Sequence, residues 1–223
     1  DSINEREDYE KILKNFKEEK IDILIGTQMV TKGVDFNNVA LVGIVSADTL
    51  LNLPDYRSGE KTYQLLSEVI STFKEIDLPI EVIIQTFNPD HHCIIAFKER
   101  DHNYFYPKEI KSREELDYPP FSHIIRIEVR GKERDKVEQK AKLLVDYLNS
   151  IYKIKDAPEF KLLGATNILM WKSRNNFKVQ VIVKVKDLEK FNQIFKKRLD
   201  KILLHHFDKE NRLTIDVDPV KML

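Results

Sequence analysis

The chain has 223 residues, 37 basic and 37 acidic, so its net charge is zero and no overall field marks a dedicated nucleic-acid-binding module. Cys93 is its single cysteine, which excludes an internal disulfide or a cysteine-based metal cluster in this sequence. No apolar run is long enough to cross a membrane, and we expect a soluble, cytoplasmic protein without a membrane partner. The length suffices for one large domain or two small ones.

The first third of the chain predicts alternating helices and strands. Helical spacing of apolar residues runs over 9–16 and again over 63–73. Three short apolar runs are typical of strands buried in a parallel sheet: Ile21–Thr27, Leu41–Val45 and Glu81–Phe87. Because helices alternate with these strands, we predict βαβ units and a parallel sheet.

The loop after the first predicted strand has the composition of a ligand-binding loop. Residues Ile23–Phe36 read ILIGTQMVTKGVDF. Gly33 lets the backbone turn or approach a ligand closely. Thr27, Lys32 and Asp35 would lie at the carboxyl edge of the strand, where open α/β sheets bind ligands. An ordinary strand-to-helix loop is the alternative interpretation.

This loop resembles motif V of superfamily 2 helicases, in the form used by the primosomal protein N′ family of replication-restart DNA helicases. Three later segments are similar to the same family: Ala47–Val69, Glu81–His92 and Asp216–Leu223. The resemblance implies that the first third is part of a RecA-like helicase lobe. Because the chain opens on Asp1 rather than methionine, we expect it to be the back part of a larger protein.

The resemblance also implies site residues. Thr27 and Lys32 are expected near DNA, and Gly33 and Asp35 near the nucleotide. In intact members ATP and magnesium drive 3′-to-5′ unwinding, and a zinc module lies upstream. The Walker A lysine and Walker B acid would also lie upstream, so this segment alone is not expected to hydrolyse ATP.

The implied partners follow from the same resemblance. Family members recognise forked or single-stranded DNA at stalled replication forks. They bind the single-stranded DNA-binding protein, and with other primosome proteins they load the replicative helicase.

One segment departs from the family. Its Gly-Arg-Ala-Gly-Arg motif, motif VI, places two arginines near the γ-phosphate, and here Thr72 and Glu75 occupy those positions. Such an arginine is worth roughly 10³–10⁵ in rate, so we expect ATP hydrolysis to be impaired. Lys74 is the alternative cation, although it lacks the planar fork of arginine. A working helicase and a non-catalytic DNA- and protein-binding loading factor both remain open.

Adjacent histidines precede the single cysteine, in the order His91, His92, Cys93. Neighbouring loop histidines rarely converge on one ion, and no second cluster with ligand spacing appears nearby. We therefore expect no metal site in this segment.

A charged, aromatic-rich stretch predicts a helical linker over 93–120, which ends at Tyr118-Pro119-Pro120-Phe121 because two prolines interrupt a helix. We predict three parts: half of a helicase lobe over 1–92, the linker, and an α+β domain over 121–223 that binds DNA or a partner.

The last hundred residues alternate as a βαββαβ unit. Strand periodicity appears at 125–129, 162–163, 179–185 and 213–217, and helical periodicity at 137–148 and 188–202. This order is that of a ferredoxin-like split βαβ fold. Two helices would cover one face of its sheet and leave the other face for a partner.

Cations and aromatic residues interleave between Trp171 and Lys186. Stacking on aromatic rings together with phosphate pairing is how single strands are held, so we predict DNA contacts at Trp171, Lys172, Arg174 and Lys178. The same chemistry captures an acidic peptide. Phe177, Lys178 and Gln180 resemble the family's aromatic-Arg-x-Gln strand, with Lys in place of Arg, and we predict that they contact a partner. A solvated sheet edge with Trp171 in the core is the alternative.

Overall fold

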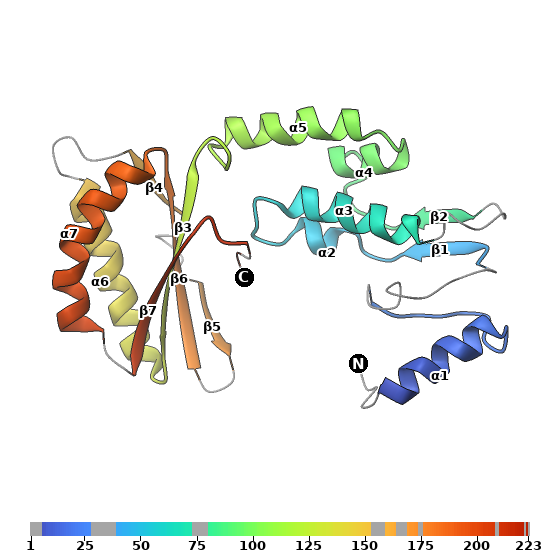
Figure 1. Cartoon of the computed structure of the whole chain (residues 1–223), viewed down its shortest axis with the longest axis horizontal. Helices are drawn as coiled ribbons and strands as arrows, with labels where there is room; N and C mark the ends of the chain where they lie inside the picture. Colours follow the sequence, from blue (N-terminus) through green and yellow to red (C-terminus); the bar gives the residue numbers. More distant parts are fainter. Residues whose placement is uncertain are drawn as a thin grey trace. The chain divides into compact units, whose positions relative to one another are not determined.

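The computed structural model describes residues 6–27, 39–72, 80–152, 159–163, 169–173, 176–207, 210–220 and 222. The chain divides into two compact units, Asp1–Glu109 and Ile110–Leu223 (Figure 1). Within the described ranges, no helix combines the length and the apolar character needed to span a membrane.

The first unit contains a small parallel sheet with helices. Its elements are α1 (Arg6–Lys17), β1 (Leu41–Ile44), α2 (Asp48–Leu51), α3 (Ser58–Ser71), β2 (Glu81–Ile84) and α4 (His92–Lys98), followed by the start of α5 (His102–Glu115). β1 and β2 pair in parallel, from Leu41 opposite Glu81 to Ile44 opposite Ile84. The predicted parallel pairing of these two apolar runs is confirmed.

The prediction of a strand at Ile21–Thr27 is wrong for this structure. The backbone there is irregular, and the side chains of Ile23 and Ile25 are 75% and 89% exposed. An apolar run becomes a strand only when a neighbour accepts and donates its backbone hydrogen bonds. Among the described residues, the parallel sheet consists of β1 and β2 alone, so this run has no neighbouring strand.

A compact cluster of apolar side chains holds α3, α4 and α5 together. Its buried members are Ala47, Leu66, Cys93, Ile94, Ala96 and Phe105. Tyr63 of α3 stacks on Phe105 of α5 with ring centroids 4.4 Å apart. α3 approaches α5 closely at Gly59, where a Cβ atom would lie 3.0 Å from Oε2 of Glu109. A small residue at position 59 therefore permits this packing.

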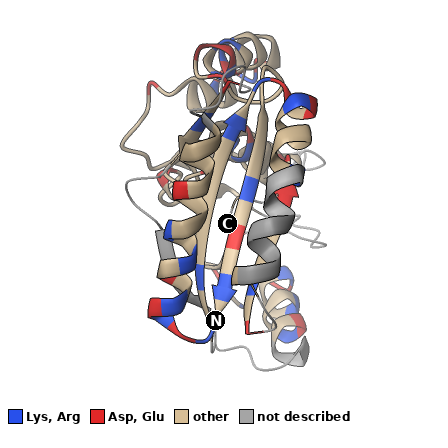
Figure 2. Ribbon diagram, turned by 90° about the vertical axis from the view of Figure 1, so that its left-hand side faces the viewer, with Lys and Arg blue, Asp and Glu red and all other residues tan. Residues whose placement is uncertain are grey.

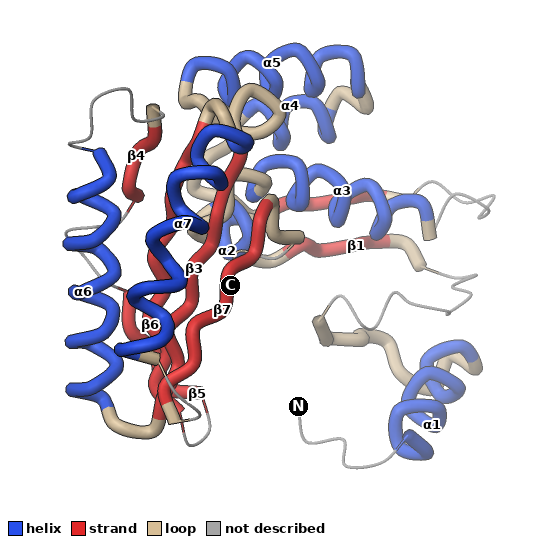
Figure 3. Tube along the Cα trace, turned by 60° about the vertical axis from the view of Figure 1, so that its left-hand side comes forward, coloured by secondary structure: helices blue, strands red, loops and turns tan. Residues whose placement is uncertain are grey.

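The second unit is an antiparallel sheet with two long helices. Its elements are β3 (His123–Gly131), α6 (Arg134–Tyr152), β4 (Phe160–Leu163), β5 (Leu169–Ser173), β6 (Asn176–Val185), α7 (Leu188–His206) and β7 (Asn211–Val217). The strand order is β4-β6-β3-β7, and β5 also pairs with β6. Figures 1 and 3 show α6 and α7 side by side on one face of this sheet.

The alternation predicted for the strands decides which face is buried. Ile125, Ile127 and Val129 of β3 are at most 1% exposed and pack with alternate valines of β6 against the helices. Fully burying one such side chain stabilises the fold by about 1.5–3 kcal/mol. The residues between them, such as Arg126 and Glu128, lie on the opposite face of the sheet.

β5 is a strand that the sequence periodicity did not predict. It pairs with residues 176–180 of β6, whereas β4 pairs with residues 182–185 of the same strand. The two short strands therefore share one edge of β6, because its ten residues are longer than either of them. This arrangement brings the segment around Trp171 to the sheet.

Candidate nucleic-acid interface

The predicted ligand-binding loop, Ile23–Phe36, is described only as far as Thr27. Thr27 is exposed, on irregular backbone. Lys32, Gly33 and Asp35 lie outside the described residues. Their roles at DNA and nucleotide therefore remain predictions.

The carboxyl edge of the β1–β2 sheet is organised by a buried aspartate. Asp48 is 5% exposed, and its carboxylate accepts hydrogen bonds from Thr86 Oγ1 (3.0 Å), the Phe87 amide (2.9 Å) and Asn88 Nδ2 (2.7 Å). These bonds, led by that from Asn88, lower the pKa of Asp48. The carboxylate thus ties the turn after β2 to the segment after β1, at the edge where parallel sheets bind ligands.

A second buried carboxylate, that of Asp55, lies just before the start of α3. Its oxygens accept from the Arg57 amide (3.0 Å), Arg57 Nε (3.2 Å) and Lys61 Nζ (2.5 Å). Burial alone would raise the pKa of Asp55, but the bonds from Lys61 and Arg57 outweigh it and lower the pKa. These ion pairs were not predicted, although the spacing of Asp55, Arg57 and Lys61 allows them.

The end of α3 is where the family's motif VI would follow. Thr72 stands directly after the helix, and its hydroxyl donates to the carbonyl of Glu68 at 3.1 Å. Lys74 and Glu75 lie outside the described residues. The side chain of Thr72 is therefore engaged with its own helix.

The paired histidines lie in a small polar cluster beside α5. His92 Nε2 lies 2.9 Å from Oε2 of Glu109, and His91 Nδ1 lies 3.1 Å from Cys93 Sγ. Burial lowers the pKa of His91 and raises that of the Cys93 thiol to about 12. In the described part of the chain, no group of three or more His, Cys, Asp or Glu residues could hold a metal ion.

In the second unit, the residues predicted to contact DNA lie along β5 and β6. Trp171 is opposite Lys178 in register, and Lys172 is opposite Phe177. The backbone of β5 is described, while the side chains of Trp171 and Lys172, and all of Arg174, lie outside the described residues. The fold thus brings Trp171 and Lys178 to neighbouring strand positions, and their contacts with DNA stay a prediction.

The residues predicted to contact a partner already have contacts within the unit. Phe177 packs against the helix-covered core, and Lys178 Nζ lies 3.5 Å from Oε2 of Glu128. Gln180 is 8% exposed, and its Nε2 donates to the carbonyl of Met222 at 2.8 Å. The C-terminal segment therefore covers part of the face that the helices leave open.

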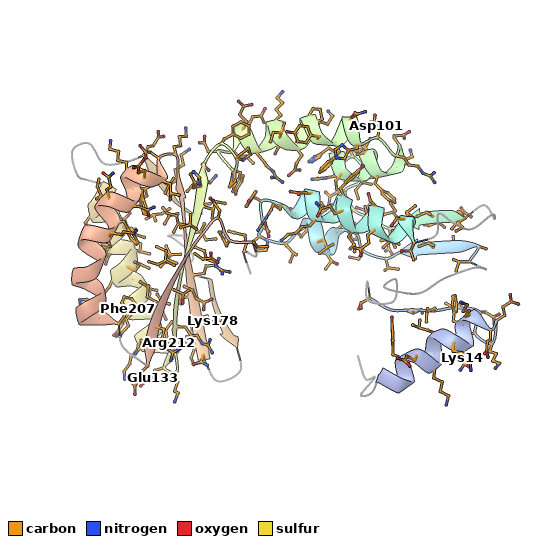
Figure 4. The ribbon with its side chains drawn as sticks, viewed as in Figure 1. Lys14, Asp101, Glu133, Lys178, Phe207 and Arg212 are labelled. Atoms are coloured by element: carbon orange, nitrogen blue, oxygen red, sulfur yellow. The ribbon has the colours of Figure 1, made fainter. Side chains whose placement is uncertain are left out.

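Two further cations share that open face. Arg130 of β3 is directly opposite both Lys178 of β6 and Arg212 of β7. Figure 2 shows basic and acidic positions along these strands, and Figure 4 shows Lys178 and Arg212 at the same end of the sheet. The alternation of β3 and β7 predicts exposed cations, but only the strand pairing places them side by side.

At the opposite end, lysines of the sheet hold the segment that precedes β3. Asp117 pairs with Lys161 (3.0 Å) and Lys186 (3.2 Å), and these bonds lower its pKa. Lys184 is buried, donates to the carbonyl of Leu116 and lies 3.8 Å from the ring centroid of Tyr118. These lysines therefore bind residues 116–118, the segment before β3.

Comparison with known proteins gives matches in both units. Residues 2–66 match the helicase conserved C-terminal domain, and residues 114–220 match the primosomal protein N C-terminal domain. The replication restart protein PriA of Bacillus subtilis is 35% identical over 223 residues, which is 100% of this chain and 27% of that protein.

Two other relatives carry the same name. PriA of Borreliella burgdorferi is 32% identical over 85% of this chain and 28% of its own length. PriA of Chlamydia pneumoniae is 32% identical over 95% of this chain and 27% of its own length. The chain therefore spans about a quarter of the length of these curated relatives. It belongs to the PriA family of replication restart proteins and corresponds to the C-terminal portion of its members.

Proposed function

We propose that the chain is the C-terminal part of an ATP-dependent 3′-to-5′ DNA helicase of the primosome, which recognises stalled forks and restarts DNA replication. The observation that carries this proposal is the order of two matches in one chain, a helicase C-terminal domain at 2–66 and the primosomal protein N C-terminal domain at 114–220. A motor segment followed by that domain favours a DNA motor with an appended recognition domain.

In this proposal the first unit contributes to the motor. Thr27 and Lys32 contact DNA, and Gly33 and Asp35 face the nucleotide. ATP and magnesium bind the full-length parent protein, of which this chain is the C-terminal part. The Walker A and Walker B groups and the zinc module of that protein lie upstream of this chain. The buried Asp48 supports this assignment, because its bonds to Thr86, Phe87 and Asn88 fix the ligand-binding edge of the sheet.

The second unit supplies recognition. We assign a helicase-lobe part to 1–92, a linker to 93–120 and a DNA- or partner-binding domain to 121–223. The strand order β4-β6-β3-β7, with β5 as an addition, supports a ferredoxin-like split βαβ fold for that domain. Its sheet has helices on one face (Figures 1 and 3), which leaves for ligands the part of the other face that the Met222 segment does not cover.

Contacts with DNA and proteins are assigned to β5, β6 and the turn between them. The proposed DNA contacts are Trp171, Lys172, Arg174 and Lys178. The proposed partner contacts are Phe177, Lys178 and Gln180, with the single-stranded DNA-binding protein, other primosome proteins and the replicative helicase as partners. The register of Trp171 with Lys178 supports the DNA assignment, because it brings to neighbouring backbone positions the two residue types that bind a base and a phosphate.

A second candidate is a restart and loading factor without an efficient motor. Thr72 and Glu75 stand where the family has arginines, and the Thr72 hydroxyl bonds to its own helix. Neither side chain can neutralise charge on a departing phosphoryl group, whose stabilisation by arginine is worth roughly 10³–10⁵ in rate.

DNA-stimulated ATPase activity of the full-length parent separates the two candidates. The unmodified protein is compared with a Thr72→Arg, Glu75→Arg double variant. Brisk turnover by the unmodified protein supports the helicase and directs attention to Lys74 as the substitute cation. If the unmodified protein does not hydrolyse ATP and the double variant does, the result supports the loading factor. If neither protein hydrolyses ATP, the helicase assignment is overturned.

A further inference from the structure

Three cations form one row across the sheet of the second unit. Lys178 of β6, Arg130 of β3 and Arg212 of β7 occupy directly opposed positions on three adjacent strands. We call these three residues the cation row. Like charges directly opposite each other destabilise a sheet. The row lies on the face away from the helices, so packing of the core does not require these side chains.

The charge of the cation row is only partly compensated inside the unit. Lys178 lies 3.5 Å from Glu128. Arg130 and Arg212 are exposed, and in the described part of the chain no carboxylate pairs with either of them. Other charged groups on this face are matched, as Arg126 is by Asp216 at 2.9 Å. The two arginines therefore differ from Arg126 and Glu128, the other charged residues of β3 on this face, which are paired.

We propose that the cation row binds the sugar–phosphate backbone of a nucleic acid strand, with Arg130 and Arg212 as phosphate contacts. This inference rests on the proposed function and adds two residues to it. Guanidinium groups match phosphate oxygens with two parallel hydrogen bonds. Neighbouring strands lie about 4.8 Å apart, so the row presents cations along a line of roughly 10 Å. Such a line suits a polyanion with successive charges.

The alternative ligand, an acidic peptide, is less well matched. Arginine clusters also recognise acidic peptide motifs, so the two ligands differ in the contacts that are available beside the row. Every side chain of the cation row is basic, and Gln180, two residues further along β6, is covered by the Met222 segment. The residue opposite Lys178 on β5 is Trp171, and tryptophan is a residue type on which nucleic-acid bases stack.

The test measures binding of the 223-residue chain to a labelled single-stranded oligonucleotide longer than about 16 nucleotides, by fluorescence anisotropy over a salt series. The test variant is Arg130→Gln with Arg212→Gln. The matched control is Lys142→Gln with Lys190→Gln, which removes two exposed cations from the helices. Thermal melting accompanies each variant, and the Tm of the arginine variant is expected not to fall, because repulsion in the row is relieved.

Each phosphate contact on a single strand contributes about 0.7 to the slope of log affinity against log salt. Loss of two contacts should reduce that slope by about 1.4 and weaken binding about 25-fold near 0.1 M salt. The control should keep the slope and affinity of the unmodified chain. An arginine variant with unchanged slope and affinity overturns the inference, as does equal weakening of the control.

An acidic peptide is titrated in parallel. If the arginine variant loses the peptide while it retains the oligonucleotide, the face is a peptide site and the inference is wrong. If the unmodified chain binds no oligonucleotide at low salt, the inference is also wrong. The ATPase measurement varies only residues 72 and 75 and leaves the cation row unchanged, so failure of the proposed function and failure of this inference remain distinguishable.

Discussion

Gln180 of β6 donates a hydrogen bond to the carbonyl oxygen of Met222, 42 residues later, at 2.8 Å. Both residues are buried, with 8% and 4% of their surface exposed. This bond ties the C-terminal segment to the sheet face opposite the helices. A partner that uses the amide of Gln180 must therefore compete with Met222 or bind next to it.

Replacement of Gln180 by methionine should destabilise the second unit. The variant keeps the length of the side chain but leaves the Met222 carbonyl without its donor, which costs about 1–3 kcal/mol. Urea denaturation of the chain, followed by hydrogen exchange of amides in β6, measures the loss. Gln193→Met, on the exposed side of α7, is the matched control and should stay within about 0.5 kcal/mol. Equal stability of the two variants would contradict the structural role of the bond.

Two glycines should respond to alanine with opposite signs. At Gly131, a Cβ atom would lie 2.5 Å from Asn211 Oδ1 and 2.8 Å from Val137 Cγ2, so Gly131→Ala should cost about 1–3 kcal/mol. Around Gly43 nothing described lies within 4 Å. Gly43→Ala should therefore stabilise β1 by about 0.5–1 kcal/mol. Hydrogen-exchange protection in each unit reports the two effects separately, and a loss at Gly43 as large as that at Gly131 would refute the packing argument.

Acid should weaken the first unit through Asp48. Its pKa is lowered in the folded state, chiefly by the bond from Asn88, so its contribution is present above the ordinary value of 3.8. The contribution is lost as pH falls below that value through the folded pKa. Asp48→Asn should lower stability at neutral pH and remove part of this acid dependence. Urea midpoints of the first unit across acidic pH measure both, with the exposed Asp90→Asn as control. An unchanged acid dependence would show that Asp48 does not set it.

Glu109 should anchor α5 to α4 within the first unit. It is 8% exposed and lies 2.9 Å from His92, so Glu109→Leu leaves a half-buried imidazole without this partner. We expect a loss of about 1–3 kcal/mol and faster amide exchange in α4. Glu114→Leu changes an exposed residue of the same helix and serves as control. Glu109→Gln, which retains a hydrogen-bonding group, should recover part of the protection. Equal exchange in the leucine variants at 109 and 114 would count against the anchor.

Several elements could be predicted because their information is local. Alternation of Ile125, Ile127 and Val129 with charged residues defines one buried face, since side chains of a strand point to opposite sides in turn. Helical periodicity likewise predicted α6 and α7, whose apolar stripes must face a core. The order Gly-Thr-Gln-Met-x-x-Lys-Gly from Gly26 to Gly33 indicated the family without any knowledge of the fold.

Other features depend on segments that meet only in the folded chain. Asp48 reaches Thr86, Phe87 and Asn88 because β1 and β2 are parallel and end at one edge. The cation row exists because β3 pairs with both β6 and β7. Alternation along each strand fixes which face a residue occupies, but not which residues of distant strands stand opposite each other.

The apolar run at Ile21–Thr27 shows that local composition alone does not decide whether a strand forms. Its composition favours a strand, yet a strand also requires a neighbour, and the described residues provide none. The sequence by itself therefore determined which residues are apolar, where periodicity changes and which family the chain resembles. Tertiary structure decided which polar groups meet, because hydrogen bonds and ion pairs between distant segments depend on strand pairing.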